Sequence, residues 1–142
     1  MTQLVVDANV VVKWLVDEDQ AEEASRVLES ESELHAPRFM AAELADVLWQ
    51  KVRRGEIPPE AAGTLADTLD NLPLFWADDE AFLSDAVRLA VEIDHPAYDC
   101  MYLALAHRLG APLVTADIRF VNRVVRTTYA SAVIRLSEYR DQ

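Results

Sequence analysis

The sequence predicts an α/β fold in which a short, mainly parallel central sheet lies between helices on both faces. Short apolar runs alternate with longer stretches that carry prolines suited to helix starts and glycines suited to helix ends. Two of the apolar runs end at an aspartate. The 142 residues are 51% hydrophobic and include only three glycines, so we expect one domain over residues 1–142 with a buried core.

The first half of the chain contains two predicted extended segments and three predicted helices. Asp19 is placed to cap the first helix. Pro37 suits the first position of the second helix, and Gly55 suits its end. Pro58 and Pro59 open the third helix. The predicted elements are strand 4–6, helix 19–29, extended segment 34–36, helix 37–54 and helix 58–70.

The second half is predicted to contain three strands and two helices. Pro96 suits the first turn of a helix that Gly110 ends. The strand that follows this helix ends at Asp117. The predicted elements are strand 72–76, helix 80–93, helix 96–109, strand 112–116 and strand 132–136.

The formal net charge of −12 would repel nucleic acid, but its distribution matters more than its sum. Residues 1–59 carry 6 basic and 12 acidic side chains, and residues 60–99 carry 1 and 10. Residues 100–142 carry 6 basic and 3 acidic side chains, so this segment is locally positive. The acidic excess elsewhere is most simply a solvated face, and a partner's docking surface is the alternative.

The chain carries no sequence signal for export or membrane insertion. Cys100 is the only cysteine, so no disulfide can form within the chain, and no Cys or His pairs have zinc-binding spacing. The start lacks the basic region and apolar stretch of a signal peptide. No apolar run approaches the roughly 18 residues that span a membrane. We therefore expect a cytoplasmic protein without a membrane partner.

Four acidic residues occupy positions that favour a common site. Asp7 and Asp117 each follow a predicted strand, and open parallel sheets bind ligands beyond the carboxyl ends of their strands. Asp99 lies in the first turn of the last predicted helix. Glu43 lies at the edge of the apolar stripe of the second predicted helix, where its carboxylate is expected to be half buried.

A divalent cation would offset the repulsion between carboxylates that are brought together in this way. Mg²⁺ and Mn²⁺ prefer oxygen ligands, and such an ion can activate water for attack on a phosphodiester. Simpler structural explanations stay open for each residue. Asp7 and Asp117 would form turns, Asp99 would favour a helix start, and Glu43 would pair with Lys51 or Arg54.

Four segments carry a family resemblance when taken together. They are Val5-Val-Asp-Ala-Asn-Val-Val-Val-Lys-Trp14, Ala36-Pro with Glu43 and Leu48 on the following helix, His95-Pro-Ala-Tyr-Asp-Cys-Met-Tyr-Leu-Ala-Leu-Ala106, and Leu113-Val-Thr-Ala-Asp117. Each is weak alone, but their order in a chain of this length is a strong signal that covers nearly the whole sequence. The chain resembles the PIN-domain ribonucleases, and within them the VapC-like toxins of bacterial and archaeal toxin–antitoxin pairs.

The resemblance implies a PIN-like three-layer α/β/α domain and an endoribonuclease that hydrolyses RNA with Mg²⁺ or Mn²⁺. In that family the acids matching Asp7, Glu43, Asp99 and Asp117 form the metal site. Asp7 and Asp99 are the first choices for direct ligands, and the other two would act directly or through waters. The resemblance also implies a homodimer and a cognate antitoxin whose C-terminal segment covers the site.

Asn9 and Thr115 match positions that would support this site by hydrogen bonding. A polar group at a helix start and a β-branched strand residue are the respective alternatives. Some relatives carry an additional acid shortly after the segment matching Leu113 to Asp117, where this chain has Ile118-Arg-Phe120. The presence of a second metal ion is therefore left open.

Three arginines follow the last of the four acids at about one-turn spacing. Arg119 and Arg123, with Arg126, would line one side of a helix and contact RNA phosphates, and an exposed face without a ligand is the alternative. His95 is expected to cap the helix that follows it. Five aromatic residues could stack on bases, although packing in the core or at a dimer contact is the simpler explanation. They are Trp14, Trp49, Trp76, Tyr98 and Tyr102.

Two other functions compete with a ribonuclease. An aspartyl-phosphate phosphohydrolase also places an aspartate after its first strand, but usually has a second one two residues later, where this chain has Asn9. A non-catalytic PIN scaffold that binds RNA or a partner protein is the other alternative. The intact set of four acids argues against it, because a binding module needs no such cluster.

Overall fold

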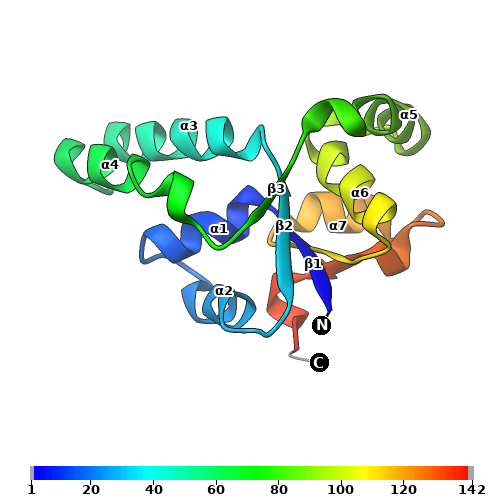
Figure 1. The fold of residues 1–142 in the computed structure, drawn as a ribbon, viewed down its shortest axis with the longest axis horizontal. Coiled ribbons are helices and arrows are strands. Elements are labelled where there is room, and N and C mark those ends of the chain that lie inside the picture. Colours follow the sequence, from blue (N-terminus) through cyan, green and yellow to red (C-terminus); the bar gives the residue numbers. More distant parts are fainter. Residues whose placement is uncertain (1, 141–142) are drawn as a thin grey trace.

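A computed structural model describes residues 2–140 and confirms the predicted α/β class (Figure 1). Within these residues, five strands pair in parallel in the order β3-β2-β1-β4-β5. Their bounds are β1 Gln3–Val6, β2 Glu33–Pro37, β3 Phe75–Ala77, β4 Leu113–Thr115 and β5 Val133–Arg135. A single domain over residues 1–142 stays a prediction.

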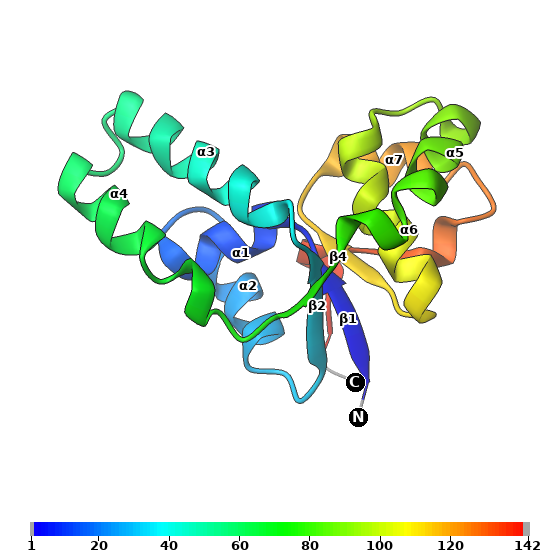
Figure 2. The ribbon, with the colours of Figure 1, turned by 45° about the horizontal axis from the view of Figure 1, so that its top comes forward.

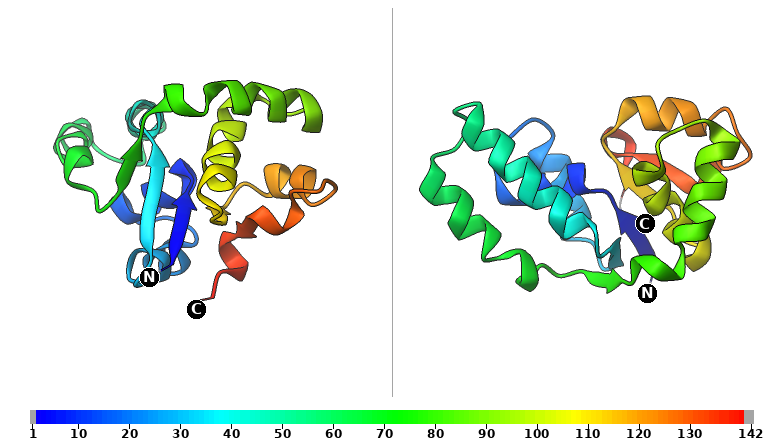
Figure 3. Two further views of the ribbon diagram at one scale, coloured as in Figure 1. Left: turned by 45° about the vertical axis from the view of Figure 1, so that its right-hand side comes forward. Right: turned by 90° about the horizontal axis from the view of Figure 1, so that it is seen from above.

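Helices cover both faces of the sheet. Figures 2 and 3 show α1 to α4 on one side and α5 to α7 on the other, which gives the three layers that the sequence predicts. In the described part of the chain, no helix is both long and apolar enough to cross a membrane. The bounds are α1 Ala8–Leu15, α2 Ala21–Leu28, α3 Met40–Arg53, α4 Pro59–Ala66, α5 Leu83–Ile93, α6 Ala97–Leu109 and α7 Ile118–Val124.

The order of the strands places a switch point between β1 and β4. From β1 the chain moves outward through α1 and α2 to β2, and through α3 and α4 to β3. It then returns across the other face through α5 and α6 to β4, which pairs with β1. Open α/β sheets bind ligands beyond the carboxyl ends of the strands at such a reversal. The residues that follow β1 and β4 are therefore the first candidates for a site.

The central strands and α6 form the core. Val5 and Val6 of β1 are fully buried, as is Val114 of β4. On α6, every residue from Cys100 to Ala106 is buried, because this helix packs against both the sheet and α5. Asp99 immediately precedes this buried run, so the packing of α6 holds it at the edge of the core.

The prediction that Pro37 begins a helix is wrong. Pro37 is the last residue of β2, and α3 begins at Met40. The Arg38 N–H donates to the Ala77 carbonyl at 3.0 Å, so the pairing of β2 with β3 continues past the proline. The fixed φ of proline suits an extended strand end as well as a first helical turn, which is why the residue type alone did not decide between them.

The sequence pattern missed α1 and misplaced the start of α2. The valines of α1, Val10 to Val12, are buried together with Ala8, so no broad polar face marks this segment as a helix. Asp19 does not cap α2, contrary to the prediction. Gln20, with a left-handed φ of 65°, precedes the first residue of the helix, Ala21.

Other boundaries shift by smaller amounts. The helix predicted over residues 58–70 ends at Ala66 and is followed by a 3₁₀ turn, Leu69–Asn71. The helix predicted to start at residue 80 begins at Leu83, after a 3₁₀ turn over Asp79–Ala81. Two further 3₁₀ turns, at Ala130–Ala132 and Leu136–Glu138, flank β5.

A largely buried ion network ties α1 to α3. The Glu18 carboxylate lies 2.8 Å from the Lys13 ammonium and 2.5 Å from the Lys51 ammonium. Lys51 also lies 3.4 Å from Glu56. Burial alone would raise the pKa of Glu18, but the hydrogen bonds and charges of the two lysines lower it overall. The network therefore fixes the helix that follows β1 against the helix that carries Glu43.

We predict that Glu18→Gln lowers the free energy of unfolding by about 1–3 kcal/mol, because both lysines keep their charge in a largely buried position and lose a partner. Urea unfolding near neutral pH measures the change. Glu22→Gln is the matched control, since the Glu22 side chain is 84% exposed and pairs with Arg26 at 3.8 Å. The control should cost less than about 0.5 kcal/mol. Equal losses in the two variants would contradict a structural role for the network.

Candidate active site

The four predicted acids lie around the switch point of the sheet. Asp7 directly follows β1, and Asp117 lies just beyond β4. Glu43 comes from the first turn of α3, and Asp99 comes from the first turn of α6. The charges of Asp99 and Glu43 act on Asp7, and that of Asp99 also acts on Glu43. Three acids are thus electrostatically coupled, whereas hydrogen bonds connect Asp117 to them.

Asp7 is the most buried of the four acids, with only 5% of its surface exposed. Its side chain does not cap α1, although the residue stands at the N-terminus of that helix. Burial raises the pKa of Asp7 to about 7, and the negative charges of Asp99 and Glu43 add to the rise. The hydrogen bond that Asp7 accepts from Thr115 opposes it. A cation beside Asp7 would therefore stabilise its charged form.

Thr115 and Asn9 connect the ends of β1 and β4. The buried Thr115 hydroxyl donates to Asp7 Oδ2 at 2.9 Å and accepts from the Asn9 amide at 3.2 Å and from the Asp117 N–H at 3.1 Å. The Ala116 N–H donates to Asn9 Oδ1 at 2.9 Å. These bonds orient two acids from different strands against each other. They also occupy the side chain of Asn9, where an aspartyl-phosphate enzyme would carry its second acid.

Glu43 is held by a tyrosine and not by a cation. The Tyr102 hydroxyl donates a hydrogen bond to Glu43 Oε1. Burial raises the pKa of Glu43, Asp99 adds to the rise, and the bond from Tyr102 opposes it. The alternative that Glu43 pairs with Lys51 or Arg54 is wrong, because Lys51 pairs with Glu18 and Glu56, and Arg54 lies near Glu56.

The hydrogen bond between Tyr102 and Glu43 was not predicted from the sequence, which suggested base stacking or packing for this tyrosine. Tyr102 lies three residues after Asp99 on α6, so the two side chains share one face of the helix. Tyr102 itself is fully buried, and burial together with the nearby carboxylates raises its pKa. It therefore remains a hydrogen-bond donor at neutral pH. The three-residue spacing between Asp99 and Tyr102 was the sequence feature that could have placed this tyrosine at the site.

His95 contacts Asp99 and does not cap α6 as predicted. Its Nε2 lies 2.6 Å from Asp99 Oδ2, and no side chain caps that helix end. The His95 ring also packs on Phe120 of α7, with 4.8 Å between ring centroids. The side chain of Asp99 is 29% exposed, compared with 14% for His95. A ligand would therefore reach Asp99 more easily than Asp7.

Asp117 caps a helix, whereas the structural alternative considered from the sequence was a turn. Its carboxylate accepts from the Phe120 N–H at 3.1 Å and so caps α7. Its own N–H donates to Thr115, which in turn holds Asp7. Asp117 is half-buried and belongs to the site through this chain of hydrogen bonds.

The aromatic residues singled out in the sequence fall into two groups. Trp14 donates its indole N–H to the Ala24 carbonyl at 2.8 Å and packs against the core with Trp76. Tyr98 and Trp49 are 72% and 55% exposed. Tyr98 packs loosely on Phe39, with 6.2 Å between ring centroids, and Phe39 also contacts Tyr102. Packing therefore accounts for part of this set and leaves Tyr98 and Trp49 accessible.

Comparison with known proteins gives a family and related sequences. Residues 4–124 match the PIN domain model. Ribonuclease VapC3 of Pyrobaculum aerophilum is 32% identical over 123 residues, which cover 81% of this chain and 89% of that protein. Ribonuclease VapC1 of Mycobacterium tuberculosis is 32% identical over 121 residues, covering 84% of this chain and 89% of that protein.

Solved structures share the fold at lower identity. A crystal structure of PAE2754 from Pyrobaculum aerophilum has a TM-score of 0.70 at 21% identity and covers 96% of this chain and 90% of that chain. A toxin–antitoxin complex from Klebsiella pneumoniae has a TM-score of 0.61 at 14% identity, with 96% and 100% covered. Mycobacterium tuberculosis VapC20, a sarcin–ricin loop cleaving toxin, has a TM-score of 0.65 at 15% identity and covers 84% of this chain and 94% of that chain. The chain therefore belongs to the PIN-domain family, as a relative of the VapC ribonucleases.

Proposed function

We propose that this VapC-like PIN-domain ribonuclease is a metal-dependent endoribonuclease and the toxin of a toxin–antitoxin pair. One observation carries the chemistry: the buried Asp7 carboxylate lies at the switch point with the charges of Asp99 and Glu43 acting on it. Bringing like charges together in a buried position costs free energy. A chain that only bound RNA would gain nothing from that cost, so a non-catalytic PIN scaffold is the less favoured function.

The residues around Asp7 fit Mg²⁺ or Mn²⁺ by donor chemistry. They offer carboxylate oxygens, which these ions prefer, and their mutual repulsion is what a divalent cation offsets. Within residues 2–140, no three Asp, Glu, His or Cys side chains lie close enough to hold an ion as they stand. At least one carboxylate would therefore turn toward the ion on binding, and the Asp99 side chain, which is 29% exposed, is more accessible than the buried Asp7.

Each residue has a distinct role in this proposal. Asp7 and Asp99 bind the ion directly, and Glu43 and Asp117 do so directly or through water. Asn9 and Thr115 orient Asp7 and Asp117 through the hydrogen bonds described above. A bound ion would supply the activation of water for attack on the phosphodiester and would offset the charge on the leaving oxygen.

Among the proposed partners, the names of the relatives support the RNA substrate and the antitoxin. The substrate is RNA, the regulator is a cognate antitoxin, and the active form is a homodimer that works in the cytoplasm. The Klebsiella pneumoniae neighbour is a toxin–antitoxin complex with the same fold, which supports an antitoxin partner. Residues 1–142 would act as one PIN-like domain.

We predict that the purified protein cleaves a structured RNA in the presence of Mg²⁺ or Mn²⁺, and that Asp7→Asn or EDTA abolishes cleavage. Denaturing gel electrophoresis of end-labelled RNA measures the products. Asp67→Asn is the matched control, because Asp67 is an exposed acid at the end of α4. Full cleavage by Asp7→Asn, or by wild type in EDTA, would show that the buried acid and the metal are not needed.

We predict that Asp7→Asn stabilises the metal-free fold at high pH. The carboxyl keeps its proton to about pH 7 when folded, compared with an ordinary pKa of 3.8. Its contribution to stability is therefore present below pH 3.8 and is lost as the pH rises to 7. Urea unfolding in EDTA at about pH 8 should show a gain of about 1–4 kcal/mol, which shrinks toward about pH 4. A gain that does not depend on pH would contradict this account.

We predict that Thr115→Val lowers the cleavage rate by about 10-fold or more, because valine keeps the shape of threonine and removes the three hydrogen bonds of its hydroxyl, one of which goes to Asp7. The half-saturating Mg²⁺ concentration should rise as well, which a purely structural defect would not cause. Thr115→Ser, which retains the hydroxyl, should recover most of the activity. Equal rates for the valine and serine variants would remove Thr115 from the site.

A further inference from the structure

A basic cleft adjoins the carboxylates on the side of α7. Its volume is about 550 Å³, which is within the range of ligand sites. We call it the arginine cleft. It lies between α7, Arg126 two residues beyond the end of that helix, and the turn from α5 to α6. The lining residues are His95, Pro96, Arg119, Asn122, Arg123 and Arg126. They include three arginines and no acid, in a protein whose formal net charge is −12.

The arginine cleft shares a wall with the candidate active site. His95 lines the cleft and also lies 2.6 Å from the Asp99 carboxylate. The same ring packs on Phe120, whose N–H is capped by Asp117. A chain lying in the cleft would therefore pass directly beside two of the four acids.

The three arginines are available to a ligand. All three are exposed, and within residues 2–140 none of them forms an ion pair or a side-chain hydrogen bond. Arg119 and Arg123 are four residues apart on α7, so their like charges face the same side and repel each other. An anion bound between them would relieve that repulsion.

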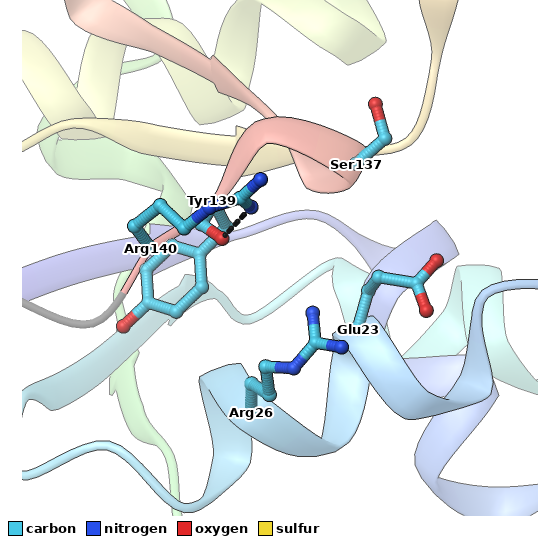
Figure 4. A pocket seen from close by; sticks show the side chains of 5 residues that line it. All are labelled: Glu23, Arg26, Ser137, Tyr139 and Arg140. Carbon is cyan, nitrogen blue, oxygen red and sulfur yellow. Dashed lines mark hydrogen bonds between the residues drawn. The ribbon is translucent and has the colours of Figure 1, made fainter.

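Two other basic clefts differ from this one. The cleft between α2 and the end of the described chain includes Glu23 beside Arg26 and Arg140, and Figure 4 shows Arg140 bonded to the Tyr139 carbonyl. The cleft on α3 contains Arg53, which stacks on Trp49, and Arg54, which bonds Gln50. Figures 1 and 2 show that end of α3 far from α7.

We propose that the arginine cleft binds a phosphate of the RNA strand next to the bond that is cut. This inference rests on the proposed ribonuclease function. Arginine forks match phosphate oxygens in geometry and charge, and Asn122 supplies a further donor. The cleft thus provides the attraction that an acidic protein needs to bring a polyanion to a cluster of carboxylates.

The test measures RNA binding separately from cleavage. A fluorescent single-stranded RNA of about 20 nucleotides is titrated with the Asp7→Asn protein in Mg²⁺ at several KCl concentrations. Arg123→Ala with Arg126→Ala in that background should weaken binding by about 10-fold or more. It should also lower the salt slope of the binding constant by about 0.7, because one phosphate contact on a single strand is lost and each contributes about that amount.

Arg53→Ala with Arg54→Ala is the matched control, because it changes the net charge equally at the remote cleft of α3. Its binding constant should stay within about two-fold of the parent. Equal losses in both double variants, an unchanged salt slope in the Arg123 and Arg126 variant, or no RNA binding by the parent would overturn the proposal. If the wild-type protein fails to cleave RNA, the proposed ribonuclease function is contradicted. If the wild type cleaves RNA but the Arg123 and Arg126 double variant binds it as tightly as its parent, only the proposed role of the arginine cleft is contradicted.

Discussion

The hydrogen bond from the Thr115 hydroxyl to the Asp7 carboxylate joins the ends of β1 and β4, and the geometry of the acidic cluster depends on it. These strands pair at the point where the order of the sheet reverses, so no continuous segment of chain sets the relative position of their ends. Thr115 also accepts from Asn9 and Asp117. One fully buried hydroxyl therefore orients the acids of two strands that are more than a hundred residues apart in sequence.

The protein and its proposed RNA substrate are both negatively charged. The structure places the carboxylates and the basic side chains that would attract RNA on separate surfaces. At the centre, burial and the neighbouring carboxylates raise the pKa of Asp7 and so favour its protonated form. A divalent cation would favour the charged form instead. Beside it, the arginines of α7 line a cleft without any acid. His95 belongs to both parts, because it contacts Asp99 and lines the cleft. Under the proposed function, attraction of the RNA and hydrolysis would take place on adjacent surfaces that share one wall.

The sequence predicted the layers of the fold and the four acids because these depend on local patterns. A short apolar run that ends at an aspartate marks both Asp7 and Asp117, whereas Asp99 stands in a first helical turn and Glu43 at the edge of an apolar stripe. The partners of the acids were not predictable in the same way. Glu43 accepts from Tyr102, which lies 59 residues away, and local spacing suggested Lys51 instead. Helix α1 was missed because it is short and its three consecutive valines are also typical of a buried strand, so the apolar run did not identify it as a helix.

A cluster of like charges weakens a fold, so the free energy must be recovered elsewhere in the molecule. Two features surround the site and serve that purpose. The buried run of α6 follows Asp99 directly, and its packing fixes Tyr102 under Glu43. The network of Lys13, Glu18 and Lys51 ties α1, which follows Asp7, to α3, which carries Glu43. Both lie outside the cluster and hold the backbones on which its acids stand. The repulsion between the carboxylates therefore acts against a rigid frame, which keeps Asp7, Glu43 and Asp99 near one another.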